Sequence, residues 1–326
     1  MRPLVFPAAL TCALTLVFNH GAHAQQAPPR QITMVVPYAA GGPLDVIGRI
    51  LAERMQVTLS QTIIIENVAG AGGNIGTGRV ARAAPDGFTI GLGNWGSHVA
   101  NGAMYDLPYD LLRDFAPISL LASEPDLIIS KKAVPASNLQ EFIAWLKSNA
   151  DKVSGGTSGV GGPSHIAAIL MQKEAGVRFP LVSYRGAGPA LQDLVAGQID
   201  MMVTGPSIVL PHLREGNIKA YAVTSKNRFA ATPDIPTVDE AGLPGLYISV
   251  WHGLWAPKGT PNEVIAKLDA AVRDALANSS VRQRLTGLAL EIPAPEEQGP
   301  GPLAAFHKAE IEKWWPIIKA ANIKPQ

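Results

Sequence analysis

The sequence predicts an α/β protein of two lobes joined by two crossing segments, with a cleft between the lobes. Three observations support this fold class. Apolar, β-branched stretches alternate with amphipathic helical stretches, as in βαβ units with a mainly parallel sheet. Glycine-rich loops follow most of the apolar stretches. Two apolar segments, at 115–130 and 246–259, are long enough to cross from one lobe to the other.

The first lobe is predicted to contain three strand–loop units. The first has a buried strand ending in a glycine loop at 31–42, followed by a helix at 43–56. Pro43 suits the first helical position, and Asp45 suits the first turn. Similar units follow at 62–85 and 86–98. Two helical patterns near the C-terminus, at 262–278 and 303–315, complete the lobe.

The second lobe repeats this alternation. An amphipathic helix is predicted at 138–150, and a glycine loop at 154–162 leads into a helix closed by Gly176. Strands are predicted within 179–184, 199–206 and 219–225, with a helix at 189–198. We therefore assign 25–122 and 226–326 to the first lobe, and 123–225 to the second.

The first 24 residues have the pattern of a secretory signal peptide. Arg2 precedes an apolar run that ends at Phe18, and Ala22-His23-Ala24 has the small-residue form of a cleavage site. An N-terminal membrane anchor is the alternative, although the apolar run is short for one. The only cysteine, Cys12, lies in this run, so cleavage after Ala24 leaves a chain without disulfides or thiol chemistry. We expect a periplasmic location.

Composition excludes one class of partner. Charged residues make up 16% of the chain, and the formal net charge is +1. Because basic blocks and Arg-rich stripes are absent from the sequence, we expect no nucleic-acid partner. The sequence contains neither H-E-x-x-H nor H-x-x-x-H, so we expect no metal site. We likewise expect no cofactor.

Glycine-rich loops recur between a predicted strand and a predicted helix. They lie at 41–42, 70–76, 91–96, 155–162 and 186–188. In open α/β sheets ligands bind beyond the carboxyl ends of the strands, where helix N-termini offer free N–H groups and a partial positive charge. Two such helix ends from opposing lobes would hold an anion without an arginine. The alternative is that these glycines only form tight turns.

Sharper motifs compete with this interpretation. The stretch "GLGNWG" matches G-x-G-x-x-G, but the sequence after it lacks the second strand and acidic residue of a dinucleotide site. The stretch "GTSGV" places Val160 where the hydrolase motif G-x-S-x-G needs glycine. A P-loop motif is absent from the sequence. An exported α/β hydrolase using Ser158 or Ser164 stays as the alternative function. His98 and His165 follow glycine loops, where capping and ligand contact are both open.

Successive stretches along the chain resemble the Bug-type receptors of tripartite tricarboxylate transporters. They include "VVPYAAGGPLDVIGRILAERM", "ENVAGAGGNIGTGRVARAAPDGFTI", "GGTSGVGGPSHIAAILM", "SYRGAGPALQDLVAGQIDMM" and "IPTVDEAGLPG". The resemblance covers nearly all of the chain after the signal peptide, in order. It implies a type II periplasmic binding-protein fold that closes on a ligand and docks on a membrane permease. Family ligands are mostly small organic carboxylates.

The resemblance also implies where the ligand binds. It assigns 38–42 in the first lobe and 157–165 in the second lobe to ligand binding, and it matches the family's Y-K-G turn to 184–186. This sequence departs from the family pattern at positions that bear on the identity of the ligand. Leu44 stands where a hydroxyl residue often precedes Asp45, and Thr204 replaces an Asp, which argues weakly against an amino acid ligand. Trp95 is open to two interpretations, stacking on an aromatic acid or packing at the edge of the lobe.

The sequence therefore predicts a receptor without a catalytic residue, for a di- or tricarboxylate or an aromatic acid. We expect it to act as a monomer that delivers its ligand to a tripartite tricarboxylate-type permease. A sensor for a membrane signalling partner is a further alternative. The residues expected to contact the ligand are Tyr38, Ala40, Gly41, Gly42, Trp95, Ser97, Thr157, Ser158, Gly161, Ser164, His165, Tyr184, Arg185 and Thr204.

Overall fold

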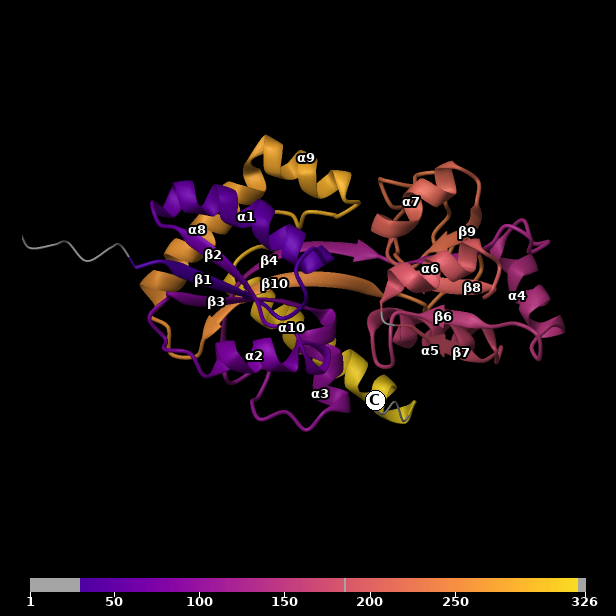
Figure 1. Cartoon of the computed structure of the whole chain (residues 1–326), viewed down its shortest axis with the longest axis horizontal. Helices are drawn as coiled ribbons and strands as arrows, with labels where there is room; N and C mark the ends of the chain where they lie inside the picture. Colours follow the sequence, from indigo (N-terminus) through magenta and orange to yellow (C-terminus); the bar gives the residue numbers. More distant parts are fainter. Residues whose placement is uncertain (1–29, 185, 322–326) are drawn as a thin grey trace, which may run out of the picture.

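Two α/β lobes lie side by side in the computed structural model, which describes residues 30–184 and 186–321 (Figure 1). Each lobe contains one five-stranded sheet. The predicted two-lobe α/β architecture is confirmed. The predicted signal peptide, Cys12 included, lies outside the described residues, as does Arg185. Within the described ranges, every helix is too short or too polar to cross a membrane.

Lobe 1 contains a sheet with the strand order β2-β1-β3-β10-β4. Its strands are β1 (Ile32–Val36), β2 (Ile63–Asn67), β3 (Thr89–Asn94), β4 (Phe115–Pro125) and β10 (Ser249–Pro257). Strands β1, β2 and β3 are parallel, and β10 is antiparallel to both β3 and β4. The mainly parallel sheet was therefore predicted correctly. Strand β10 is reversed because it enters the lobe from the opposite side.

Helices cover both faces of the lobe 1 sheet (Figure 1). One face packs against α1 (Pro43–Leu59), α8 (Asn262–Ala277) and α9 (Ser279–Gly287). The other packs against α2 (Asn74–Ala81), the π-helical turn η2 (Gly96–Ala100), α3 (Asn101–Met104) and α10 (Pro300–Ala320), and the short 3₁₀ turn η1 (Ala71–Gly73) precedes α2. Helix α9 is not among the predicted helices.

Lobe 2 repeats this plan with the strand order β7-β6-β8-β5-β9. Its strands are β5 (Leu127–Lys131), β6 (Gly155–Thr157), β7 (Leu181–Ser183), β8 (Met201–Thr204) and β9 (Ile218–Val223). Strand β5 is the reversed strand, antiparallel to β8 and β9. The helices are α4 (Leu139–Ser148), α5 (Pro163–Ala175), α6 (Ala187–Val195) and α7 (Pro206–Arg214). In each lobe, only one strand is antiparallel to the others. It is the strand by which the chain arrives from the other lobe.

The two crossings meet at one threonine. Strand β4 ends at Pro125 and β5 begins at Leu127, so Asp126 is the link of the first crossing. The Thr224 hydroxyl accepts a hydrogen bond from the Asp126 N–H at 2.8 Å and contacts the Ile248 carbonyl of the returning segment at 2.7 Å. Thr224 is buried. The two crossing segments are therefore fastened together between the lobes.

The predicted domain boundary after residue 225 is wrong by more than twenty residues. The Val223 N–H donates to the Pro236 carbonyl, and the Val238 N–H donates to the Val223 carbonyl. Phe229 packs in the core shared by β5 and β9. Residues 226–248 therefore belong with lobe 2, and the chain returns to lobe 1 at β10. The sequence hides this because the segment is irregular and joins the lobe 2 sheet through one isolated bridge, between Val223 and Thr237.

Several glycines predicted in loops lie in strands instead. Gly91 and Gly93 belong to β3, and Gly155 and Gly156 belong to β6. A Cβ on Gly93 would lie 2.1 Å from the His98 ring, and one on Gly156 would lie 2.3 Å from Ile199. These glycines allow side chains to pack directly against the sheet. Their contribution is to the core, and the ligand-binding interpretation of 91–96 is wrong for these positions.

Candidate ligand-binding cleft

A cavity of about 520 Å³ lies between the two lobes. Lobe 1 contributes the loop after β1, the end of β3 and the start of β10, and lobe 2 contributes the starts of α5, α6 and α7. The lining residues are Tyr38, Ala39, Gly42, Pro43, Leu44, Asn94, Glu124, Asp126, Ser158, Pro163, Ser164, Gly186, Ala187, Thr204, Gly205, Ser207, Ile208, Val250 and His252.

The lobe 1 turn (residues 41–45) aims the N-terminus of α1 at this cavity. Gly41 has φ +80°, a conformation that favours glycine, and Gly42 caps the helix with Pro43 at its first position. The buried Asp45 carboxylate accepts a hydrogen bond from the Gly41 N–H at 2.9 Å. The hydrogen bond from Arg49, above all, lowers the pKa of Asp45 to about 2. The turn is thus held by a carboxylate that stays ionised.

The lobe 2 turn (residues 161–165) presents α5 in the same way. Gly161 has φ +75°, and Gly162 caps the helix with Pro163 at its first position. Here the Gly161 N–H donates to Nδ1 of His165 at 2.9 Å. Burial lowers the pKa of His165, so the imidazole is neutral near pH 7 and its Nδ1 is free to accept.

The glycine loop before α5 is closed by two serine hydroxyls. Ser164 Oγ accepts a hydrogen bond from the Ser158 N–H at 2.7 Å, and the two hydroxyls also lie 2.7 Å apart. Because Ser158 and Ser164 line the cavity, these bonds fix the shape of its lobe 2 wall.

A third Gly-Pro helix start was missed from the sequence. Gly205 caps α7 and Pro206 is its first residue, and both Gly205 and Ser207 line the cavity. The signal was present, since Gly205-Pro206 follows a predicted strand just as Gly42-Pro43 and Gly162-Pro163 do. Helix α6, capped by Gly186, also begins at the cavity. Four helix N-termini therefore surround one space, and their partial positive charges favour an anion there.

Two acidic residues and a histidine line the cavity beside the crossing, and none of them was predicted. Glu124 is 7% exposed, Asp126 is 1% exposed and His252 is 2% exposed. Burial, and then the neighbouring Asp126, raise the pKa of Glu124 to about 8. Burial alone raises the pKa of Asp126 to about 7 and lowers that of His252 to about 4. The sequence contains one sign of this acidic pair, because Glu124 and Asp126 flank Pro125 within an otherwise apolar run.

Six of the predicted contact residues lie at the cleft. Five line the main cavity: Tyr38, Gly42, Ser158, Ser164 and Thr204. Gly161 lines an adjoining cavity of about 390 Å³, which also includes Tyr38 and Ser158 and continues towards Asn101 and Tyr105. Their contact with a ligand stays a prediction.

Other predicted residues support the loops behind the cleft. Ala40 and Gly41 are exposed beside it, and His165 holds Gly161 as described. The Tyr184 hydroxyl donates a hydrogen bond to the Asp193 carboxylate at 2.6 Å, and the backbone N–H of Tyr184 donates to the Thr157 carbonyl. None of these four lines either cleft cavity.

Three predictions of direct contact are contradicted by burial. Trp95, Ser97 and Thr157 are 0% exposed. The Trp95 ring packs edge-on against Trp314 at 5.2 Å, so it is a core residue and not a platform for an aromatic acid. Ser97 Oγ accepts from the Asn94 N–H at 3.1 Å and thereby holds the end of β3. Each of the three shapes the cleft from behind.

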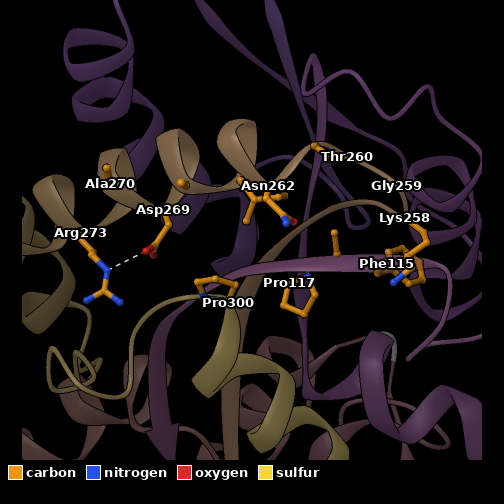
Figure 2. A pocket seen from close by; sticks show the side chains of 13 residues that line it. Phe115, Pro117, Lys258, Gly259, Thr260, Asn262, Asp269, Ala270, Arg273 and Pro300 are labelled. Carbon is orange, nitrogen blue, oxygen red and sulfur yellow. Dashed lines mark hydrogen bonds and ion pairs between the residues drawn. The ribbon is translucent and has the colours of Figure 1, made fainter.

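Another cavity, of about 570 Å³, lies within lobe 1 (Figure 2). Asp269 and Arg273 of α8 form an ion pair at 2.9 Å along one side, and Phe115, Pro117 and Pro300 line the other. None of the predicted contact residues that the structure describes lines it. Because it involves a single lobe, lobe closure would not enclose a ligand there.

The fold and the cleft together define a class, the two-lobed α/β binding proteins that hold a small ligand between their lobes. Comparison with known families places the chain within that class. Residues 47–323 match the model of TctC, the tripartite tricarboxylate transporter family receptor. The chain belongs to this family, as its resemblance to the Bug-type receptors implied.

Solved structures of similar proteins agree with this assignment. MatC from Rhodopseudomonas palustris, solved with bound malate, is 42% identical with a TM-score of 0.79, over 90% of this chain and 100% of MatC. The periplasmic binding protein BugD is 38% identical with a TM-score of 0.80, over 92% and 100%. R. palustris Rpa4515, solved with adipate, is 31% identical with a TM-score of 0.82, over 92% and 99%.

Proposed function

We propose that this chain is a periplasmic receptor that captures a small organic carboxylate between its lobes and delivers it to a tripartite tricarboxylate-type permease. One observation carries the proposal: four glycine-capped helix N-termini, one from lobe 1 and three from lobe 2, surround a single cavity between the lobes. Helix N-termini are ready-made sites for carboxylates, and closure would remove water from the anion they hold.

The relatives support the same ligand class. MatC was solved with malate and Rpa4515 with adipate, and both ligands are carboxylates. The burial of Trp95 removes the aromatic platform on which an aromatic acid would have stacked. We therefore favour an aliphatic carboxylate. Its carboxylate would lie among the starts of α1, α5, α6 and α7.

The hydrolase alternative gains no support from the geometry. Ser158 and Ser164 are hydrogen-bonded to each other, and Nδ1 of His165 accepts from the Gly161 N–H rather than from a serine. A serine nucleophile needs a base within hydrogen-bond reach of its hydroxyl. The arrangement here braces a loop.

Titration calorimetry of the purified chain with a panel of aliphatic carboxylates tests the proposal. We expect saturable binding of at least one acid and a matching rise in the thermal unfolding midpoint. Ser207→Asp should weaken binding at least tenfold, because it places a carboxylate at the α7 N-terminus in the cavity. Ser280→Asp is the matched control, since it makes the same change near the start of α9, outside the cleft.

Failure of every carboxylate to bind would overturn the proposal. So would equal effects of the two Asp variants on affinity. Delivery to a permease requires a separate measurement, namely carboxylate uptake by cells that carry or lack this chain, with the permease genes present in both.

A further inference from the structure

The cavity contains a polar cluster that a simple carboxylate does not use. Oε2 of Glu124 and Oδ2 of Asp126 are buried and lack a hydrogen-bond partner among the described residues. Both ring nitrogens of His252 are also buried and unpartnered. Ser207 of α7 hydrogen-bonds to Glu124, but these four atoms gain no protein partner for the water they lose, which is costly in a buried site.

The two carboxyl groups are fixed in place from different directions. Glu124 lies at the end of β4, where it pairs with Val250 of β10, and its carboxyl group lies against Gly205 of α7. A Cβ on Gly205 would come within 2.9 Å of the Glu124 carboxyl atoms. Asp126 is held by Thr224 at the crossing. The pair therefore belongs to the junction of the lobes and stays beside any ligand enclosed there.

The chain supplies no cation to this pair within the part that the structure describes. The described lining residues include neither Lys nor Arg. Burial keeps His252 neutral near pH 7, with a pKa of about 4, and Tyr38 stays protonated with a pKa of about 12. Without a cation the raised pKa values of Glu124, about 8, and Asp126, about 7, show that the pair resists ionisation. A dicarboxylate would bring a second negative charge towards the pair and raise both values further. A positive charge would satisfy both free oxygens.

Resting on the proposed function, we propose that the ligand of this chain is a carboxylate that also carries a cationic nitrogen, an amino acid or a similar zwitterion. Its carboxylate lies among the helix N-termini, and its ammonium group lies between Glu124 and Asp126. This separates the ligand from malate and adipate, which carry no cation. The replacement of an Asp by Thr204 argued against an amino acid ligand. In this proposal the acidic partner of the ammonium group comes from the crossing segment instead of from the end of β8.

Calorimetry with four matched ligands tests this assignment. Butanoate, 2-aminobutanoate, 4-aminobutanoate and pentanedioate share one carboxylate and differ in the group that would meet the acidic pair. We expect at least one of the two amino acids to bind ten times more tightly than both butanoate and pentanedioate. In Glu124→Gln and Asp126→Asn this preference should fall below about threefold. Glu296→Gln, an exposed acid away from the cleft, should keep it.

A proton count separates ligand contact from a purely structural role. Binding heats measured at pH 7.5 in buffers of different ionisation enthalpy report protons exchanged. An ammonium group beside Glu124 and Asp126 lowers the pKa of both, so the amino acid should release protons, and Glu124→Gln should reduce the release. The thermal unfolding midpoint of Glu124→Gln without ligand should be unchanged or higher, because a buried unpaired acid has been neutralised.

The outcomes distinguish the two proposals. Carboxylates that bind with no preference for an amino group, or with proton uptake, would overturn this inference and leave the receptor function standing. The absence of any binding across the four ligands and the wider carboxylate panel would overturn both.

Discussion

The lobe 1 turn and the lobe 2 turn have nearly the same sequence, Gly-Gly-Pro-Leu-Asp and Gly-Gly-Pro-Ser-His. In both, the first glycine has a positive φ, the second caps a helix and proline starts it. In both, the N–H of the first glycine donates to the side chain four residues later. Two lobes thus present a helix N-terminus by one local design.

The difference lies in the acceptor that holds each turn. Asp45 is an ionised carboxylate with further partners in Arg49 and Asn67, whereas His165 is a neutral ring with a depressed pKa. A charged acceptor makes stronger hydrogen bonds than a neutral one. The comparison indicates that the lobe 1 turn is rigid and insensitive to pH, while the lobe 2 turn is held more weakly and can be loosened by acid.

The largest expected effect comes from removing the lobe 1 acceptor. Asp45→Ala removes a buried carboxylate that accepts hydrogen bonds from the Gly41 N–H, the Arg49 side chain and the Asn67 amide, so we expect the free energy of unfolding to fall by about 3 kcal/mol. Urea denaturation measures it. Arg49→Gln should cost less than about 1 kcal/mol, because the Arg49 side chain is 54% exposed. His165→Ala should cost about 1 kcal/mol. Equal losses for Asp45→Ala and His165→Ala would remove the proposed difference between the turns.

The second prediction concerns what the turns share. Gly41→Ala and Gly161→Ala each place a side chain at a positive φ, which costs about 1–2 kcal/mol. At Gly41 the cost is purely conformational, since an added Cβ meets nothing within 4 Å. Gly188→Ala, in α6 with equally open space, should be neutral or stabilising. Urea denaturation of the three variants checks this, and a loss confined to one turn would show that the backbones are not equivalent.

Much of this architecture was predictable because it depends on local patterns. Gly-Pro after an apolar run predicted the starts of α1 and α5, since proline is favoured at the first position of a helix. The same dipeptide stands at Gly205-Pro206, before α7, but the run at 206–214 is short and contains a second proline, Pro211. Local patterns also explain why the reversed strands β5 and β10 were identified as crossings.

The acidic pair and the buried tryptophan were beyond such patterns because burial depends on the whole fold. Trp95 follows a glycine loop in sequence, yet it turns away from the cleft to pack on α10, more than two hundred residues later. Glu124 and Asp126 read as polar interruptions of an apolar run. Only the convergence of β4, α7 and the return segment shows that they face one cavity.

A smaller effect is expected at the serine pair, which exists only in lobe 2. Ser164→Ala removes the acceptor of the Ser158 N–H, so the free energy of unfolding should fall by about 1 kcal/mol. Carboxylate affinity should fall several-fold, because the lining wall loses a brace, and binding should not vanish. The corresponding lobe 1 residue, Leu44, makes no such bond. Complete loss of binding in Ser164→Ala would mean that this hydroxyl holds the ligand itself.

The smallest effect concerns acid, and it tests whether the two turns respond differently. The folded-state pKa of His165 is lowered by burial, so its contribution is complete above pH 6.5 and is lost as the pH falls through the folded value. Asp45, with a folded pKa of about 2, keeps its contribution until the pH falls below about 4. Between pH 7.5 and 5, only the lobe 2 turn should therefore weaken.

The variant His165→Asn isolates this effect, because asparagine offers an acceptor that does not titrate in this range. We expect the wild-type chain to lose more unfolding free energy than the variant between pH 7.5 and 5, by less than about 1 kcal/mol. Urea denaturation at both pH values gives the difference. Contributions from Glu124, Asp126 and His252 are common to both proteins and cancel. An identical pH dependence of the two proteins would show that protonation of His165 does not loosen the lobe 2 turn. The serine pair, and not the imidazole, would then be what holds the turn.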